Sequence, residues 1–350
     1  MNDKLQQLQR DRGGIFNENS RVVDSFANDE TAFNAAIQTT ALWDGSHWGL
    51  IQLTGDDSSR FLHNQTTNNI NTIQPGQGCE TVFITSTGRT IDIATVLKHE
   101  KNIRIVVSPQ RHQYLLQWMD RFLFPMDKVE IKDLVSEFSL FCLIGPQSNV
   151  YLEKLGVEPS QIPTPGSHCL INYANQEFCL AAGSNLSLAG YTLVVPTEIA
   201  AQLWSELVEV GAVPMGDRVW EQLRIQQGRP LADHELTEDF NPLEAGLWSM
   251  ISFNKGCYIG QEIIARLNTY KGVKRQLWCL ELNGLVNTPA QIMLNQQKVG
   301  ILTSCSEIQG KFMGLGYIRS KFGGAGLTVT IDNTEGNVID APFLTHEYVE

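Results

Sequence analysis

Apolar residues along the chain alternate between a spacing of two residues, typical of strands, and one of about 3.6 residues, typical of helices. Strands are predicted at residues 47–55, 103–109 and 138–146, and residues 79–98 are predicted to form two strands around a tight Ser-Thr-Gly turn. Helices are predicted at residues 57–65, 110–124, 197–211 and 216–228, the last two ending in glycine. Because most strands form hairpins and do not alternate regularly with helices, the pattern predicts an α+β fold.

The pattern changes after about residue 272. Short strands separated by Gly and Asn are predicted at residues 275–282, 291–304, 312–318 and 327–332. They predict a β-rich C-terminal domain, which we place at residues 271–350. Residues 1–40 contain only a short amphipathic piece, and we expect them to form an N-terminal arm.

Composition narrows the classes of function. The 350 residues are 42% hydrophobic and 18% charged, which suits a globular protein with a sizeable core. The formal net charge of −12 opposes binding to phosphate backbones, so direct nucleic-acid binding is not expected. No apolar run approaches the roughly 18 residues of a membrane-spanning helix, so no membrane partner is expected. Glycine-rich dinucleotide motifs and P-loop motifs are absent as well.

The cysteines predict free thiols. The chain has seven, an odd number, with no CxxC pair and no Cys/His spacing typical of a metal site, so no stable metal is expected. The N-terminus shows no secretory signal. We therefore expect a reducing compartment, either the cytoplasm or, as the alternative, the matrix or stroma of an organelle for the mature form.

One cysteine differs from the others in its surroundings, the stretch NKGCYIGQEIIAR. Lys255 lies two residues before Cys257 and is close enough to favour its thiolate form. Gly256 and Gly260 permit unusual backbone angles and the close approach of a ligand. The amides that open the helix predicted from Gln261 would also favour the thiolate. These features make Cys257 the candidate reactive thiol and Lys255 its helper.

The same stretch has simpler explanations. A cysteine beside an aromatic residue such as Tyr258 is more often structural than reactive. Glu262 and Arg266 add polar groups near the thiol, but their i,i+4 spacing equally suits a surface ion pair worth about 0.3 kcal/mol. From the residues alone, both a structural and a reactive Cys257 remain open.

Four stretches, in this order along the chain, resemble the YgfZ-type proteins, folate-binding relatives of the glycine-cleavage aminomethyltransferase (T-protein, GcvT). They are LTGDDSSRFLHNQTTNNI, STGRTIDIATV, LRIQQGRPL and KGCYIGQEIIAR, and the resemblance extends from about residue 41 to the C-terminus. It implies a three-lobed, T-protein-like architecture around a folate-sized cavity. Two interleaved lobes would span residues 41–270, and residues 271–350 would form a β-barrel-like domain.

Three departures favour the YgfZ-type branch over the T-proteins. T-proteins carry two adjacent aspartates where this chain has Asp92 and Ile93, and isoleucine cannot orient an amine. The glutamate that grips the pterin in T-proteins corresponds to Gln226, whose amide can still pair with a pterin edge. T-proteins also lack the cysteine signature that surrounds Cys257.

The resemblance implies a protein that binds tetrahydrofolate or another reduced folate and supports the assembly or repair of iron–sulfur clusters in client enzymes. Through such a client it would affect tRNA modification indirectly. Its partners would be iron–sulfur enzymes or cluster-assembly proteins, bound transiently. Cys257 would be the working thiol. The residues expected to face the folate are Gln226, Arg224, Asp92, Arg89 and Asn68.

Two alternative functions remain open. The first is a folate-dependent one-carbon transferase of the T-protein class, which Ile93 disfavours because such chemistry needs a charged or titratable group at the reacting centre. The second is a non-catalytic partner-binding protein, which would not need a reactive Cys257. The predicted folate contacts have structural alternatives too: a turn former at Asn68, a solvated residue at Arg89, a solvent-facing Asp92, and a pairing within the helix for Arg224.

Overall fold

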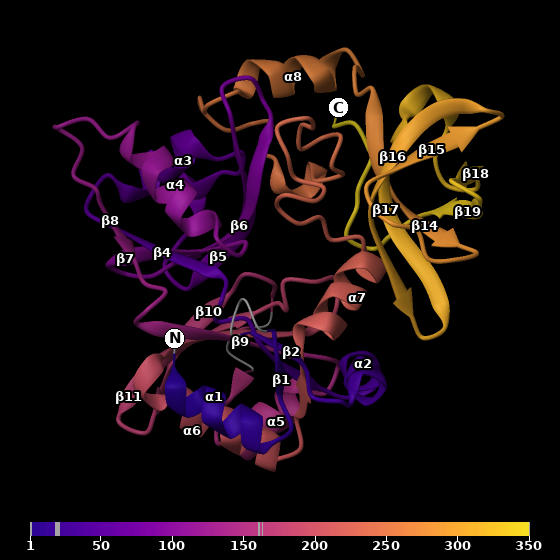
Figure 1. Cartoon of the computed structure of the whole chain (residues 1–350). Coiled ribbons are helices and arrows are strands. Elements are labelled where there is room, and N and C mark those ends of the chain that lie inside the picture. Colours follow the sequence, from indigo (N-terminus) through magenta and orange to yellow (C-terminus); the bar gives the residue numbers. More distant parts are fainter. Residues whose placement is uncertain (1, 18–21, 160–161, 163, 350) are drawn as a thin grey trace. The chain divides into compact units, whose positions relative to one another are not determined.

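The computed structural model describes residues 2–17, 22–159, 162 and 164–349 (Figure 1). Contacts between residues group the chain into two compact units. Unit 1 comprises residues 1–59, 72–80 and 94–220, and unit 2 comprises residues 60–71, 81–93 and 221–350. Each unit is thus built from three segments that are separate in the sequence. The predicted boundaries at residues 40 and 270 stay predictions.

The helices follow most of the segments with helical spacing. The α-helices in the described ranges are α1 (Asp3–Asp11), α2 (Asp29–Gln38), α3 (Ser58–Gln65), α4 (Arg111–Asp120), α5 (Ser148–Lys154), α6 (Thr197–Glu209), α7 (Asp217–Gln227) and α8 (Gln261–Thr269). The 3₁₀ helices are η1 (Ile70–Thr72), η3 (Trp248–Met250) and η4 (Ser320–Phe322). Across these described ranges, no helix is long and apolar enough to cross a membrane.

Two sheets form the framework of unit 1. One has the strand order β10-β11-β12-β9-β3-β13, antiparallel apart from the parallel pair β13–β3, with strands β3 (Ala41–Asp44), β9 (Phe138–Ile144), β10 (His168–Tyr173), β11 (Gln176–Ala182), β12 (Gly190–Pro196) and β13 (Val213–Met215). The other has the order β5-β6-β7-β4-β8, with strands β4 (Gly49–Thr54), β5 (Gln77–Ile84), β6 (Thr90–Lys98), β7 (Asn102–Val107) and β8 (Glu130–Asp133). The ends of β5 and β6 that face their shared turn belong to unit 2.

The N-terminal segment takes part in the core of unit 1. Its strands β1 (Ile15–Phe16) and β2 (Val23–Ser25) pair with each other. Helix α6 buries one apolar stripe, and Leu5 of helix α1 joins the same cluster. Phe26 stacks on Trp204 of α6 with ring centroids 6.1 Å apart. The described part of the predicted arm is therefore packed against the body of unit 1.

The C-terminal part of unit 2 is a closed six-stranded barrel, as expected. Its order is β14-β17-β16-β15-β18-β19, with strands β14 (Arg275–Leu282), β15 (Ala290–Leu294), β16 (Gln297–Ile308), β17 (Lys311–Arg319), β18 (Thr328–Ile331) and β19 (Thr334–Ile339), drawn in orange to yellow in Figure 1. Alternate residues fill its interior, including Leu280, Ile292 and Leu302, each with no exposed surface. The mixed α/β fold with a C-terminal β-barrel is thereby confirmed.

Candidate functional site

The stretch around Cys257 forms a loop of unit 2, here called the thiol loop (residues 252–260), which is fastened to the end of helix α3 and the residues after it. Before the cysteine, the amide of Ser252 donates to the carbonyl of Thr67 over 3.0 Å. After it, the amide of Ile259 donates to the carbonyl of Asn64, also over 3.0 Å. Backbone hydrogen bonds therefore hold the loop on both sides of the thiol.

Lys255 adds a third attachment from inside the loop. Its side chain is buried, and its ammonium donates to the backbone carbonyls of His63 (2.6 Å), Thr66 (2.5 Å) and Asn68 (2.7 Å). An ammonium has three N–H donors, and three carbonyls face it here. The same nitrogen lies 4.6 Å from the centre of the Tyr258 ring, a cation–π distance. This side chain fastens the loop, and its predicted influence on the thiol stays a prediction.

Tyr258 and Gly260 complete the packing of the thiol loop. Burial of Tyr258 raises the pKa of its phenol. Gly260 has φ +79°, and a Cβ there would lie 2.5 Å from the carbonyl oxygen of Thr85. A side chain at this position would therefore suffer both backbone strain and a clash. The glycine lets the start of helix α8 approach the turn between β5 and β6.

Several residues of the motif lie on the surface. Cys257 and Gly256 are exposed, as are Glu262 and Arg266 on helix α8, and Gln261 is half-buried. Packing accounts for Lys255, Tyr258 and Gly260, as the preceding contacts show. It gives no reason for a cysteine at the exposed position.

The other thiols are less accessible than Cys257. All seven cysteines lie in the described ranges as thiols, and Cys257 is the exposed one. Burial raises the pKa of Cys179 and of Cys279 to about 12, which keeps these thiols protonated at neutral pH. The remaining cysteines are the buried Cys142 and the half-buried Cys79, Cys169 and Cys305.

Arg224 is placed in a buried network that joins helix α7 to the barrel. It has no exposed surface and donates to Glu221 (2.6 Å), to Glu235 (3.1 Å) and to the hydroxyl of Ser304 (2.9 Å). Tyr317 of strand β17 donates to the carbonyl of Glu235 over 2.8 Å. A ligand could reach the guanidinium only by displacing these partners, so the contacts favour the structural alternative for Arg224.

The other predicted folate contacts also belong to unit 2. Asp92 has no exposed surface, which excludes the solvent-facing alternative, and Ile93 beside it is also buried. Arg89 is partly exposed and donates to the carbonyl of Asp239 over 3.0 Å. Asn68 and Gln226 are half-buried, and the backbone carbonyl of Asn68 accepts a hydrogen bond from the Lys255 ammonium. These placements leave their role in folate binding a prediction.

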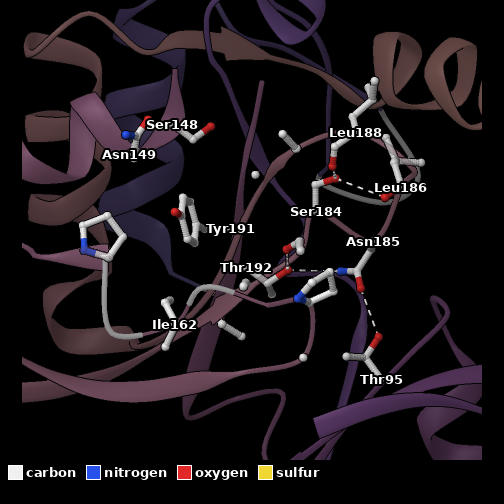
Figure 2. Close-up of a pocket in the computed structure, with 18 of the residues that line it drawn as sticks. Thr95, Ser148, Asn149, Ile162, Ser184, Asn185, Leu186, Leu188, Tyr191 and Thr192 are labelled. Carbon is white, nitrogen blue, oxygen red and sulfur yellow. Dashed lines mark hydrogen bonds between the residues drawn. The ribbon is translucent and has the colours of Figure 1, made fainter. Parts of the chain in front are cut away.

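Unit 1 contains a cavity of about 770 Å³. It lies between strands β5 and β6, the turn from β9 into α5, and the connection from β11 to β12 (Figure 2). This volume falls within the range of about 300–1,000 Å³ common for small-molecule sites. The ionisable residues of its described lining are Glu80, Glu153, Cys79 and Tyr191, so the lining contains no cation.

Asn185 is the centre of the polar lining. Its side-chain oxygen accepts a hydrogen bond from Thr95 (3.0 Å), and its side-chain nitrogen donates to Thr192 (3.5 Å), as Figure 2 shows. Thr192 in turn donates to the carbonyl of Gly183 over 2.8 Å. Ser184 donates to the carbonyl of Leu188 over 2.7 Å. Hydrogen bonds within the protein thus fix hydroxyl and amide groups around the cavity, so its lining offers both donor and acceptor chemistry.

Sequence reasoning did not select this cavity. The available signal was the stretch GSNLSLAG at residues 183–190, in which small and polar residues separate two apolar strands. The same composition is common in plain turns, and only the fold shows that the stretch faces strands β5 and β6 within unit 1. No group of three or more His, Cys, Asp or Glu side chains is placed to hold a metal ion in the ranges described.

The chain matches the family described as "GCVT N-terminal domain" over residues 9–255. It is 42% identical over 340 residues to "Putative transferase At1g60990, chloroplastic" of Arabidopsis thaliana, covering 96% of this chain and 78% of that protein. It is 29% identical over 328 residues to an aminomethyltransferase of Caldanaerobacter subterraneus, covering 90% of this chain and 87% of the relative. The family match thus extends from helix α1 into the thiol loop.

The architecture is also found in a solved structure. The glycine cleavage system aminomethyltransferase T from Bartonella henselae superposes with a TM-score of 0.87 over 99% of both chains, at 18% sequence identity. At that identity the likeness concerns the fold. It agrees with the mixed α/β architecture and the C-terminal barrel described above.

Proposed function

Because the chain belongs to the GCVT N-terminal domain family, we propose that it is a YgfZ-type member that binds tetrahydrofolate or another reduced folate and supports the assembly or repair of iron–sulfur clusters through the thiol of Cys257. The observation behind this proposal is the exposed Cys257 on a loop held in place by its neighbours. A nucleophilic or ligating thiol needs both access and a fixed position, and the loop supplies both.

The cavity of unit 1 supports the folate part of the proposal. A pterin ring offers donors and acceptors along its edges, and the fixed amide and hydroxyls around Asn185 suit such a ring. The carboxylate of Glu80 in the lining suits the amino group of a pterin. The predicted contacts Gln226, Asp92 and Arg89 belong to unit 2, so variants of the two sets would report which one the folate uses.

Ile93 supports the YgfZ-type branch. It is buried in strand β6 at the position that resembles the second aspartate of T-proteins. An alkyl side chain offers no charge to a developing iminium and no acceptor to an amine. We therefore propose that the protein has no glycine-cleavage activity.

The names of relatives favour a second candidate, a folate-dependent transferase. Proteins named aminomethyltransferase are 27–30% identical to this chain, and the relative from Arabidopsis thaliana is named as a transferase. A folate-turnover assay with candidate amine donors separates the two proposals. Transfer of an aminomethyl group at a rate near that of a T-protein would support the transferase and exclude the YgfZ-type function.

Location and partners follow from the proposed role. The chloroplastic name of the Arabidopsis thaliana relative favours the organelle alternative, a stroma, over the cytoplasm. The partners would be iron–sulfur enzymes or cluster-assembly proteins that bind transiently at the exposed Cys257. An effect on tRNA modification would then be indirect, through a client enzyme with a cluster.

Complementation tests the proposed function. A strain with a cluster-repair defect is supplied with wild type, with Cys257→Ser, or with Cys169→Ser as a control for a half-buried thiol on strand β10. Wild type and Cys169→Ser should restore growth under oxidative stress, and Cys257→Ser should not. Full restoration by Cys257→Ser would instead favour the non-catalytic partner-binding protein.

A further inference from the structure

We propose that His63 is the general base that accepts the proton of the Cys257 thiol. This inference rests on the proposed function, in which Cys257 is the working thiol. It adds an activating residue that lies almost 200 positions away in the sequence. Four observations lead to it: the position of the imidazole, its unpaired Nδ1 atom, the attachments of the thiol loop, and the charge beside the ring.

The imidazole of His63 is directed at the thiol loop. His63 lies on the last turn of helix α3 and is buried, with a relative exposure of 5%. Its Nε2 lies 3.6 Å from the point where a Cβ on Gly256 would stand. Gly256 immediately precedes Cys257, and consecutive Cα atoms are about 3.8 Å apart. Because Gly256 has no side chain, the ring can approach the loop backbone at the residue before Cys257.

Packing does not explain why a histidine occupies this position. The Nδ1 atom of His63 is buried and has no hydrogen-bond partner among the residues described. Buried polar atoms are normally paired, because leaving one unpaired costs about 1–3 kcal/mol. An apolar side chain would avoid that cost. A function that needs an imidazole explains why the cost is tolerated.

The attachments of the loop hold its backbone beside this ring. The Lys255 ammonium is bound to the carbonyl of His63 itself, and the amide of Ile259 is bound to the carbonyl of the next residue, Asn64. The two attachments lie two residues before and two residues after Cys257. The last turn of helix α3 therefore supplies both the proposed base and two carbonyls that hold the thiol loop.

Charge keeps the ring ready to accept a proton. Burial and the positive charge of Lys255 both lower the pKa of His63, so the imidazole is neutral at neutral pH. In the proposed step the S–H bond of Cys257 breaks, its electron pair stays on sulfur, and the proton passes to Nε2. The thiolate then offsets the new positive charge next to Lys255. The proton leaves to solvent once sulfur has formed its new bond.

The rate at which iodoacetamide labels Cys257 tests this step, because sulfur forms a bond to carbon, iodide leaves, and the thiol proton must be accepted. We compare His63→Gln and His63→Ala with wild type from about pH 5.5 to 10 by peptide mapping. At pH 7 both variants should react about tenfold more slowly. Above about pH 9.5, where a thiol ionises unaided, all three should agree within about twofold. Added imidazole should restore part of the rate in His63→Ala alone.

The shape of the pH profile separates a base from a structural residue. If the variants are labelled more slowly by the same factor at every pH, or at the same rates as wild type, the proposal is overturned. Wild type gives an independent test that needs no variant: its profile should show an acid-side inflection from the imidazole, and a single thiol ionisation would overturn the proposal. Complementation by Cys257→Ser is read separately, so a failure of the proposed function is distinguished from a failure of this inference.

Discussion

Replacing Lys255 with methionine should lower the free energy of unfolding of unit 2 by about 3–5 kcal/mol. The substitution removes the ammonium from the carbonyls of His63, Thr66 and Asn68, which lie 2.5–2.7 Å from it. Each buried carbonyl left without a partner costs about 1–3 kcal/mol, or about 3–9 kcal/mol for the three. Part of this loss is offset, because the variant no longer buries a charge. The remainder is a large fraction of a typical stability of about 5–15 kcal/mol.

Hydrogen exchange followed by mass spectrometry gives the local measurement. Peptides covering residues 252–260 report on the amides of Ser252 and Ile259, whose hydrogen bonds fasten the thiol loop. Their protection should fall about 100-fold or more in Lys255→Met, in keeping with a loss of at least about 3 kcal/mol. Lys311→Met is the matched control in the same unit, because Lys311 is 75% exposed and lies 3.9 Å from Glu281. Its effect should stay below about 1 kcal/mol. A loss of less than about 1 kcal/mol in Lys255→Met would refute the account of the loop.

The remaining predictions concern the motif glycine, acid stability and the cavity. Gly260→Ala should cost about 2 kcal/mol more in thermal unfolding than Gly310→Ala, because both have positive φ (+79° and +76°) but only Gly260 would bring a Cβ against a carbonyl. Burial lowers the pKa of His47 to about 4, so between pH 6.5 and 4 the unfolded chain binds more protons than the folded one. The free energy of unfolding should therefore fall by up to about 3 kcal/mol over this range. Urea titrations should show a smaller fall in His47→Gln. Calorimetry should find one tetrahydrofolate bound with a Kd of roughly micromolar size, and Asn185→Asp, which loses the amide donors, should weaken binding about tenfold; no heat, and no competition by folinic acid, would exclude the folate part of the proposal.

Local sequence patterns predicted the helices and strands better than they predicted which surfaces these elements pack against. The alternation at residues 47–55 and the apolar run at 138–146 correspond to strands β4 (Gly49–Thr54) and β9 (Phe138–Ile144). The short C-terminal strands were predictable because each has a period of two and ends at a Gly or Asn turn. In the structure they form a closed barrel. The segment predicted as an N-terminal arm shows this limit. Leu5 and Phe26 are buried in the core of unit 1, and no local pattern in residues 1–40 indicates the surface that covers them.

The site shows the same limit. Exposure of Cys257 agrees with the neighbours in its motif, which are small or polar. The direction of Lys255 could not be predicted, because its three carbonyl partners lie about 190 positions earlier in the sequence. From the sequence, Arg224 could equally contact a ligand or pair within its helix, and its contacts with Glu221, Glu235 and Ser304 favour the structural role. The cavity around Asn185 is formed by segments distant in the sequence, which no short-range pattern joins.

The central claim is that the thiol of Cys257 maintains iron–sulfur clusters, and the activity of a radical-type iron–sulfur enzyme in complemented cells tests it most directly. The enzyme is assayed in extracts of the deficient strain that carry wild type, Cys257→Ser or Cys169→Ser at matched protein levels. The account predicts full activity with wild type and with Cys169→Ser, and the activity of the empty strain with Cys257→Ser. Equal activity with Cys257→Ser and wild type would contradict it, and the exposed cysteine would then have to be explained by partner contact.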